Sequence, residues 1–178
     1  MPLPFSINTS IRERDRCIRW DVYKKDISIC SKFVLAEWNK IVSDIYSDGE
    51  WNEFLSECEG YVQCYILYRC RDNKPIAFSF LLQEDDKGRV VSLHGGGWYK
   101  TVENTLLYYR GLIVLIRNLI NKGLKVRTSC FNDNMVAKRF IRSVGFVQYM
   151  ETSTRLLFWI NEKRLYNSPI YKRIYQKL

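Results

Sequence analysis

The only histidine of this 178-residue chain, His94, stands directly before three consecutive glycines, Gly95 to Gly97. An imidazole titrates near neutrality, so His94 is the best candidate for a general base. Glycine weakens the interior of a strand. Three glycines late in a predicted strand from Arg89 to Trp98 therefore indicate a β-bulge, or the close approach of another group to bare backbone. Two alternatives stay open: a structural role for His94, and a bulge that holds no ligand.

A second candidate segment runs from Leu124 to Phe146. Residues 124–130 alternate between apolar and polar like a strand. The short polar side chains of residues 132–134 favour a helix start, because they can accept hydrogen bonds from free backbone N–H groups. The helix that follows should end at Gly145. Its apolar face consists of Val136, Ala137, Phe140, Ile141 and Val144.

The order Asn134-x-x-Ala137-x-x-Phe140, followed by Gly145-Phe146, resembles the second cofactor motif of the GCN5-related N-acetyltransferase (GNAT) superfamily. The elements expected over roughly residues 60–160 follow the order of that superfamily. The resemblance implies an N-acyltransferase that carries an acyl group from acetyl-CoA, or another acyl-CoA, to an amine acceptor without a metal. It also implies cofactor contacts at Asn134, Ala137 and Phe140.

The resemblance gives the glycine-rich strand a role as well. In the superfamily this strand splays away from its parallel neighbour, and its unpaired backbone groups hold the pantetheine arm of the donor. Carried over to this chain, cofactor binding falls on Gly95, Gly96, Gly97 and Trp98. Glycine suits this role because it lets the chain bend and lets a ligand lie against the backbone. The N–H groups of Gly96 and Gly97 would then meet the developing oxyanion.

The resemblance places a pyrophosphate site at a helix start, with Lys100, Thr101, Glu103 and Asn104 as the assigned residues. The family pattern falls on residues 103–108, where both of its small residues are missing and Glu103 adds a negative charge. Backbone N–H groups of residues 100–104 could still bind phosphate, with Lys100 offsetting Glu103. The alternative, that Thr101 or Asn104 only caps the helix, stays open.

The proton donor of the family has no counterpart here. Many members donate the final proton from a Tyr seven residues after the Asn of the motif, and that position is Ile141 in this chain. Ser129, Cys130 and Tyr149 lie near it in the sequence without occupying it. Cys130 has no second histidine that could activate it as a nucleophile. For the separate step in which the amine loses its proton, His94 or a bound water is the expected acceptor.

Composition favours one domain spanning residues 1–178. Hydrophobic residues make up 47% of the chain, and no linker rich in Pro, Gly or Ser divides it. The six cysteines form no Cys-x-x-Cys pair, which argues against a zinc site of the usual spacing. The most apolar run, residues 106–120, is too short for a bilayer and is broken by charges. We expect a cytoplasmic protein without a metal, as a monomer or homodimer.

The whole pattern predicts an α/β fold of the GNAT type. A central, mostly antiparallel mixed sheet with a splayed parallel pair should carry helices on both faces. Strands are expected over residues 17–23, 61–70, 74–83, 89–98 and 124–130, with a final hairpin over 147–160. Helices are expected over residues 31–43, about 49–58, 105–122 and 135–144.

The net charge of +9 is concentrated at the carboxyl end, where residues 163–178 include no acidic residue. Ser168-Pro169 predicts the start of a basic helix over about 168–178, which an apolar face would dock. A basic surface attracts polyanions such as RNA, although a solvated basic face without a partner fits equally well. Two functions are carried forward: the favoured transferase, and a catalytically weak binding module of the same fold that engages RNA or another acidic partner.

Overall fold

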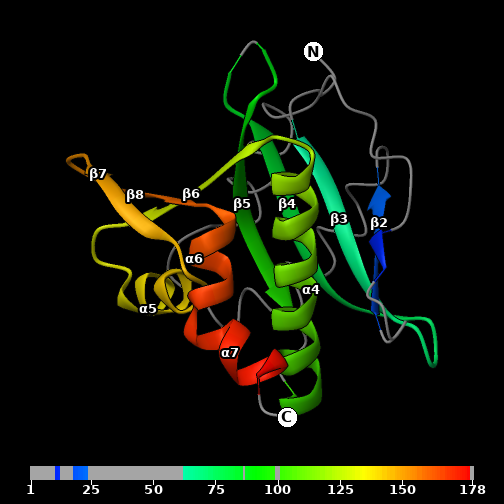
Figure 1. Ribbon diagram of the computed structural model, residues 1–178. Coiled ribbons are helices and arrows are strands. Elements are labelled where there is room, and N and C mark those ends of the chain that lie inside the picture. The colour runs from blue at the N-terminus through cyan, green and yellow to red at the C-terminus, as the bar shows by residue number, and fades with distance from the viewer. Residues whose placement is uncertain (1–10, 13–17, 24–61, 86, 99–100, 177–178) are drawn as a thin grey trace, which may run out of the picture.

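The computed structural model describes residues 11–12, 18–23, 62–85, 87–98 and 101–176. Eight strands form one sheet in the order β1-β2-β3-β4-β5-β6-β8-β7 (Figure 1). Their bounds are β1 Ile11–Arg12, β2 Ile18–Tyr23, β3 Val62–Arg69, β4 Lys74–Gln83, β5 Val90–Trp98, β6 Lys125–Phe131, β7 Val147–Glu151 and β8 Arg155–Ile160. β5 and β6 pair in parallel and every other pair is antiparallel, which confirms the predicted mixed sheet.

Four described helices accompany the sheet: α4 Val102–Asn121, α5 Met135–Val144, α6 Glu162–Asn167 and α7 Pro169–Tyr175. The long helix α4 lies across the sheet, and α6 and α7 pack against it (Figure 1). α7 also contacts α5, so the carboxyl end of the chain ties the two central helices together. The helices expected over residues 31–43 and about 49–58 lie outside the described residues.

Capping residues account for the ends of the described helices. Asn134 caps α5 by accepting a hydrogen bond from the N–H of Ala137 at 2.9 Å, and Gly145 ends the helix with a positive φ of 106°. Ser168 caps α7 ahead of Pro169, as predicted. α4 begins at Val102, three residues earlier than expected, because Thr101 provides the cap. The short helix α6 was not predicted.

The core lies between α4 and the sheet. Gly111 allows the closest approach, because a Cβ at that position would lie 2.8 Å from a methyl carbon of Leu67. Trp20 is fully buried there and donates its indole N–H to the carbonyl oxygen of Gly111 at 2.7 Å. α4 is thus fixed against β2 and β3, which determines where its N-terminal end lies relative to the end of β5. Among the described helices, none is long and apolar enough to cross a membrane.

Candidate functional site

The sheet opens between its two parallel strands. The pairing of β5 with β6 ends at Leu93 and Thr128, although β5 continues to Trp98 and β6 to Phe131. At the last pair, the Thr128 hydroxyl donates to the carbonyl oxygen of Leu93 at 2.9 Å. The predicted splay of the parallel pair is therefore confirmed. Beyond Leu93, β5 is left without β6 along one edge.

A β-bulge occupies the same part of β5. Leu93 pairs with Leu81 of β4, whereas Gly96 pairs with Ser79, so His94 and Gly95 together face the single residue Phe80. This two-against-one count confirms the bulge that the glycines indicated. The backbone of His94, the three glycines and Trp98 thus lies in the open part of the sheet. The side chains of His94 and Trp98, and the whole of Lys100, lie outside the described part of the structure.

Aromatic residues of α4 and α5 pack close to this open part. Tyr108 of α4 is 3% exposed and its hydroxyl hydrogen-bonds with Ser79, the β4 partner of Gly96. Its ring stacks on Phe140 of the α5 motif at a centroid distance of 6.2 Å, and the ring of Tyr109 also stacks on Phe140, at 5.4 Å. Burial raises the pKa of Tyr108 to about 12, so the phenol stays protonated near neutrality.

These contacts were not visible in the sequence. Tyr108 stands where the family pattern has a small residue, which is the one sequence signal that could have singled it out. Phe140 reaches α4, while Asn134 and Ala137 are accounted for by the helix cap and by packing against the core. Ile141 occupies the position where many family members have the proton-donating Tyr, and it is buried in that core.

The start of α4 holds the residues expected near a pyrophosphate. The Thr101 hydroxyl accepts from the N–H of Asn104 at 3.0 Å, and the Thr101 carbonyl accepts from the N–H of Thr105 at 2.9 Å. Thr101 is therefore the helix cap, which was one of the two predicted alternatives. In an α-helix the first N–H groups have no acceptor within the helix, and this cap satisfies that of Asn104. Among the described residues, no acceptor is seen for the N–H groups of Val102 and Glu103.

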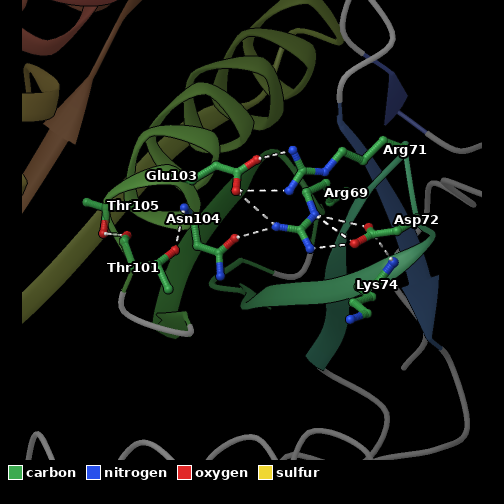
Figure 2. Close-up of polar contacts among 8 residues, drawn as sticks. All are labelled: Arg69, Arg71, Asp72, Lys74, Thr101, Glu103, Asn104 and Thr105. Atoms are coloured by element: carbon green, nitrogen blue, oxygen red, sulfur yellow. Dashed lines mark hydrogen bonds and ion pairs between the residues drawn. The ribbon is translucent and has the colours of Figure 1, made fainter.

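Two arginines neutralise the carboxylate that had seemed to oppose phosphate binding. Arg69 and Arg71, from the end of β3 and the following turn, approach the Glu103 carboxylate at 3.2 Å and 3.0 Å (Figure 2). Arg69 also reaches the side-chain oxygen of Asn104 at 3.5 Å. Its charge was missed because 34 residues separate it from Glu103. Lys100 had been expected to offset Glu103, and the described residues that do so are Arg69 and Arg71.

Asp72 completes this cluster. Arg69 hydrogen-bonds the Asp72 carboxylate, and the backbone N–H of Lys74 donates to the same group at 3.3 Å (Figure 2). The Arg69 hydrogen bond lowers the pKa of Asp72 to about 2. Two arginines thus face two carboxylates, and the charges within the cluster balance.

A pocket of about 520 Å³ lies on another side of the same helix start, between α4, α5 and α7. Its apolar walls come from Val102, Leu106, Pro169, Ile170 and Ile174. Its polar lining comes from Thr101, Thr105, Tyr109, Ser143 and Arg173. Glu103 does not line it, and Figure 2 shows Thr101 and Thr105 on one side of the helix start and Glu103 on the other. Neither the pocket nor Arg173 was singled out from the sequence.

Cys130 lacks the properties of an activated nucleophile. The thiol is buried, and burial raises its pKa despite the opposing charges of Lys138, Arg155 and Arg142. Among the described residues, no group of three His, Cys, Asp or Glu side chains could hold a metal ion.

Comparison with known proteins gives similarity in structure alone. No family model matches the sequence, and no curated protein matches it. Among solved structures, a probable GNAT acetyltransferase from Chromobacterium violaceum has a TM-score of 0.67 at 10% identity, over 92% of this chain and 91% of that chain. The nucleotide-linked sugar GNAT protein FdhC, without ligand, has a TM-score of 0.63 at 13% identity, over 95% and 99%.

A third structure includes a ligand. It is the PaiA N-acetyltransferase of Thermoplasma acidophilum in complex with coenzyme A, with a TM-score of 0.57 at 14% identity over 80% of this chain and 98% of that chain. At such identities the likeness concerns the fold. Together with the open parallel pair and the bulge, it shows that this chain has the fold of the GNAT N-acetyltransferases, as the motif from Asn134 to Phe146 had indicated.

Proposed function

We propose that the chain is an acyl-CoA-dependent N-acyltransferase that transfers an acetyl group, or another acyl group, directly to an amine acceptor. The observation that carries this proposal is the opening of the sheet after Leu93, where no described strand faces the bulge and the glycines of β5 on the β6 side. The fold supports a donor of this class. The proposal includes a cytoplasmic location and a reaction without a metal.

The open edge of β5 suits an extended ligand arm. Residues 94–98 have backbone donors and acceptors on the side that β6 has left, and an extended chain can satisfy them as an added strand would. Three glycines let that chain approach without meeting a side chain. We assign to the negative charge that develops on the acyl oxygen whichever N–H group of Gly96 or Gly97 faces away from β4, because neighbouring N–H groups of a strand point to opposite edges.

The first turn of α4 suits the phosphates. The N–H groups of Val102 and Glu103, which have no acceptor among the described residues, lie at the positive end of a 20-residue helix. Because Arg69 and Arg71 balance Glu103, its carboxylate no longer repels an anion there. Phosphate binding through main-chain N–H groups does not require the small residues that the family pattern would place at positions 106 and 108.

We assign to His94 the role of accepting the proton that the amine loses. The donor would supply a thioester, whose carbon–sulfur bond breaks as the amine nitrogen bonds to the acyl carbon. His94, or a water that it holds, accepts the proton that the nitrogen loses, and the leaving sulfur takes a proton from solvent. Solvent provides this proton because the buried Ile141 occupies the position of the family's proton-donating Tyr.

The proposal is tested by blocking the open edge. Gly96→Val should abolish acetyl-CoA binding in calorimetry while the protein stays folded, because a β-branched side chain fills the space beside the backbone. Val90→Ile is the matched control, since it enlarges a residue of the same strand where β5 still pairs with β6. Unchanged affinity in a folded Gly96→Val protein would contradict the placement of the donor.

The base is tested through the pH profile of turnover. Imidazole protonation should set the acidic limb of the rate, and His94→Ala should slow turnover by about 10²-fold. The variant should also lose that limb. Full activity of His94→Ala, with the limb retained, would assign the proton to water alone.

A binding module of the same fold remains the second candidate. Tyr108 fills a position where the family has a small residue, and α5 and α7 include five basic residues and no acidic one in the sequence, which would suit RNA. Calorimetry separates the two functions. Acetyl-CoA binding without RNA binding supports the transferase, and salt-sensitive RNA binding without acetyl-CoA binding supports the module.

A further inference from the structure

An arginine lies beside the open part of the sheet. Arg155 is the first residue of β8 and pairs with Phe131, the last residue of β6. This pair lies beyond Thr128, where the parallel pairing of β5 and β6 has already ended. The Arg155 side chain lies over the same stretch, because it contacts both Ser129 and Phe131. A guanidinium therefore stands on the β6 wall of the opening to which we assign the acyl donor.

The burial pattern of β8 shows on which face of the sheet Arg155 lies. Leu156, Phe158 and Ile160 are buried in the core with residues of α4, whereas the alternating residues, which begin with Arg155, are half-buried. The stacked rings of Tyr108 and Phe140 lie on the core side. Among the described residues, the face of Arg155 is thus the one left for the approach of an acceptor.

The described partners of the Arg155 guanidinium are neutral. It donates to the Ser129 hydroxyl at 3.1 Å, and its central carbon lies 4.4 Å from the centre of the Phe131 ring. None of the ion pairs between described residues includes Arg155. In contrast, Arg127 on the same face of β6 reaches the Glu84 carboxylate at 3.4 Å. A guanidinium has five N–H donors, so Arg155 keeps donors for a carboxylate.

The neighbouring turn holds Arg155 in place. The Thr152 hydroxyl accepts from the backbone N–H of Arg155 at 3.0 Å. The Asn132 side-chain amide donates to the carbonyl oxygens of Thr152 and Ser153 at 3.1 Å and 3.3 Å, which ties the turn before β8 to the end of β6. A side chain that is fixed by its backbone and by an aromatic ring loses little conformational freedom when it binds a ligand.

We propose that the acceptor is an amine that carries a carboxylate, as an amino acid does, and that Arg155 binds this carboxylate. The inference rests on the proposed function, because it names the acceptor class of the same reaction. An arginine binds a carboxylate through two parallel N–H donors, which gives both strength and selectivity. The half-buried Phe131 and Leu157 on the same face suit an apolar side chain of the acceptor. Arg155 determines specificity, and the bonds made and broken remain those of the proposed transfer.

The test follows acetyl transfer from acetyl-CoA to the common amino acids and to their amides, which lack the carboxylate. Mass spectrometry measures kcat/KM for each acid and its amide. Arg155→Gln should lower the value for the acids about 30-fold and leave that for the amides unchanged. Arg155→Lys should recover part of the loss, because lysine keeps the charge without the paired donors. Unchanged acetyl-CoA affinity in calorimetry shows that each variant is folded.

Arg127→Gln is the matched control. Arg127 also lies over an aromatic ring, 5.2 Å from the centre of Tyr149, but it has a carboxylate partner and pairs with Ser92 where the parallel ladder is still closed. The control should change neither value by more than about twofold.

Three results would overturn the assignment of Arg155: unchanged transfer to the acids in Arg155→Gln, equal losses for acids and amides in that variant, or a wild-type protein that binds acetyl-CoA and acetylates none of the acids. Each of these leaves the donor site standing. A wild-type protein that does not bind acetyl-CoA would instead contradict the proposed function itself.

Discussion

Two sides of one helix start carry opposite arrangements of charge. On one side, Glu103 meets Arg69 and Arg71, and Asp72 meets Arg69, so every charge has a partner. On the other side, Arg173 lines a pocket with both apolar and polar walls and has no ion-pair partner among the described residues. The difference shows that the number of basic residues says little about where an anion binds. What matters is which cations are left without a carboxylate after folding.

Deleting α7, which includes the unpaired Arg173, should have the largest effect on stability and binding. Deletion of residues 167–178 removes Ile170, Tyr171, Ile174 and Tyr175, which pack against the core. From the apolar area that these half-buried side chains cover, we expect a loss of roughly 3–5 kcal/mol in the free energy of unfolding, with loss of the pocket. Chemical denaturation and calorimetry with acetyl-CoA measure the two effects.

The double variant Lys172→Gln/Arg173→Gln is the control for the deletion, since it removes charge and keeps the apolar face of α7. It should retain the stability of the wild type. A truncated protein of unaltered stability that has lost most of its RNA affinity would show that the basic residues of α7 serve a nucleic-acid partner instead.

Breaking the ion pair between Arg69 and Glu103 should weaken anion binding, because the Glu103 carboxylate is then less well compensated. Arg69→Ala leaves the more exposed Arg71 as the one described cation that pairs with Glu103, so acetyl-CoA affinity should fall about fivefold at low salt. Adding Glu103→Gln to Arg69→Ala should restore the affinity, because the uncompensated charge is gone. Lack of rescue in the double variant would mean that Arg69 contributes to binding in some other way.

The smallest expected effect is a pH dependence of stability from Asp72. Its pKa is about 2 in the folded protein, below the ordinary value of 3.8, so ionised Asp72 favours the folded state. The contribution is full above pH 4 and is lost as the pH falls from about 4 to 2. The difference in urea midpoint between wild type and Asp72→Asn should therefore be constant above pH 4 and shrink below it. A difference that stays constant down to pH 2 would contradict the Arg69–Asp72 assignment.

Local patterns made most of the fold predictable. Alternation of polar and apolar residues placed the strands from β2 to β6 within about two residues, and the caps at Asn134 and Ser168 and the stop at Gly145 were correct because each depends on neighbours a few residues away. The glycines of β5 predicted the bulge for the same reason. The start of α4 was predicted three residues late, at Thr105, because Thr101 caps the helix and residues 102–104 form part of its first turn.

The surroundings of the site depended on contacts between distant residues and could not be read from spacing. Arg69 meets Glu103 across the sheet and helix layers, and Arg173 reaches the pocket only because α7 folds back onto α4. The sequence showed a basic carboxyl end without showing which of its charges stays unpaired. Such pairings follow from the packing of whole elements, for which a single sequence provides no period or motif.

The open slot in the sheet begins where Thr128 meets Leu93. The Thr128 hydroxyl donates to the carbonyl oxygen of Leu93 at this last pair of β5 and β6. Five residues of β5 follow Leu93, which gives a slot of roughly 17 Å at about 3.3 Å per residue. The point at which the parallel ladder ends therefore limits the length of extended chain that can lie along β5.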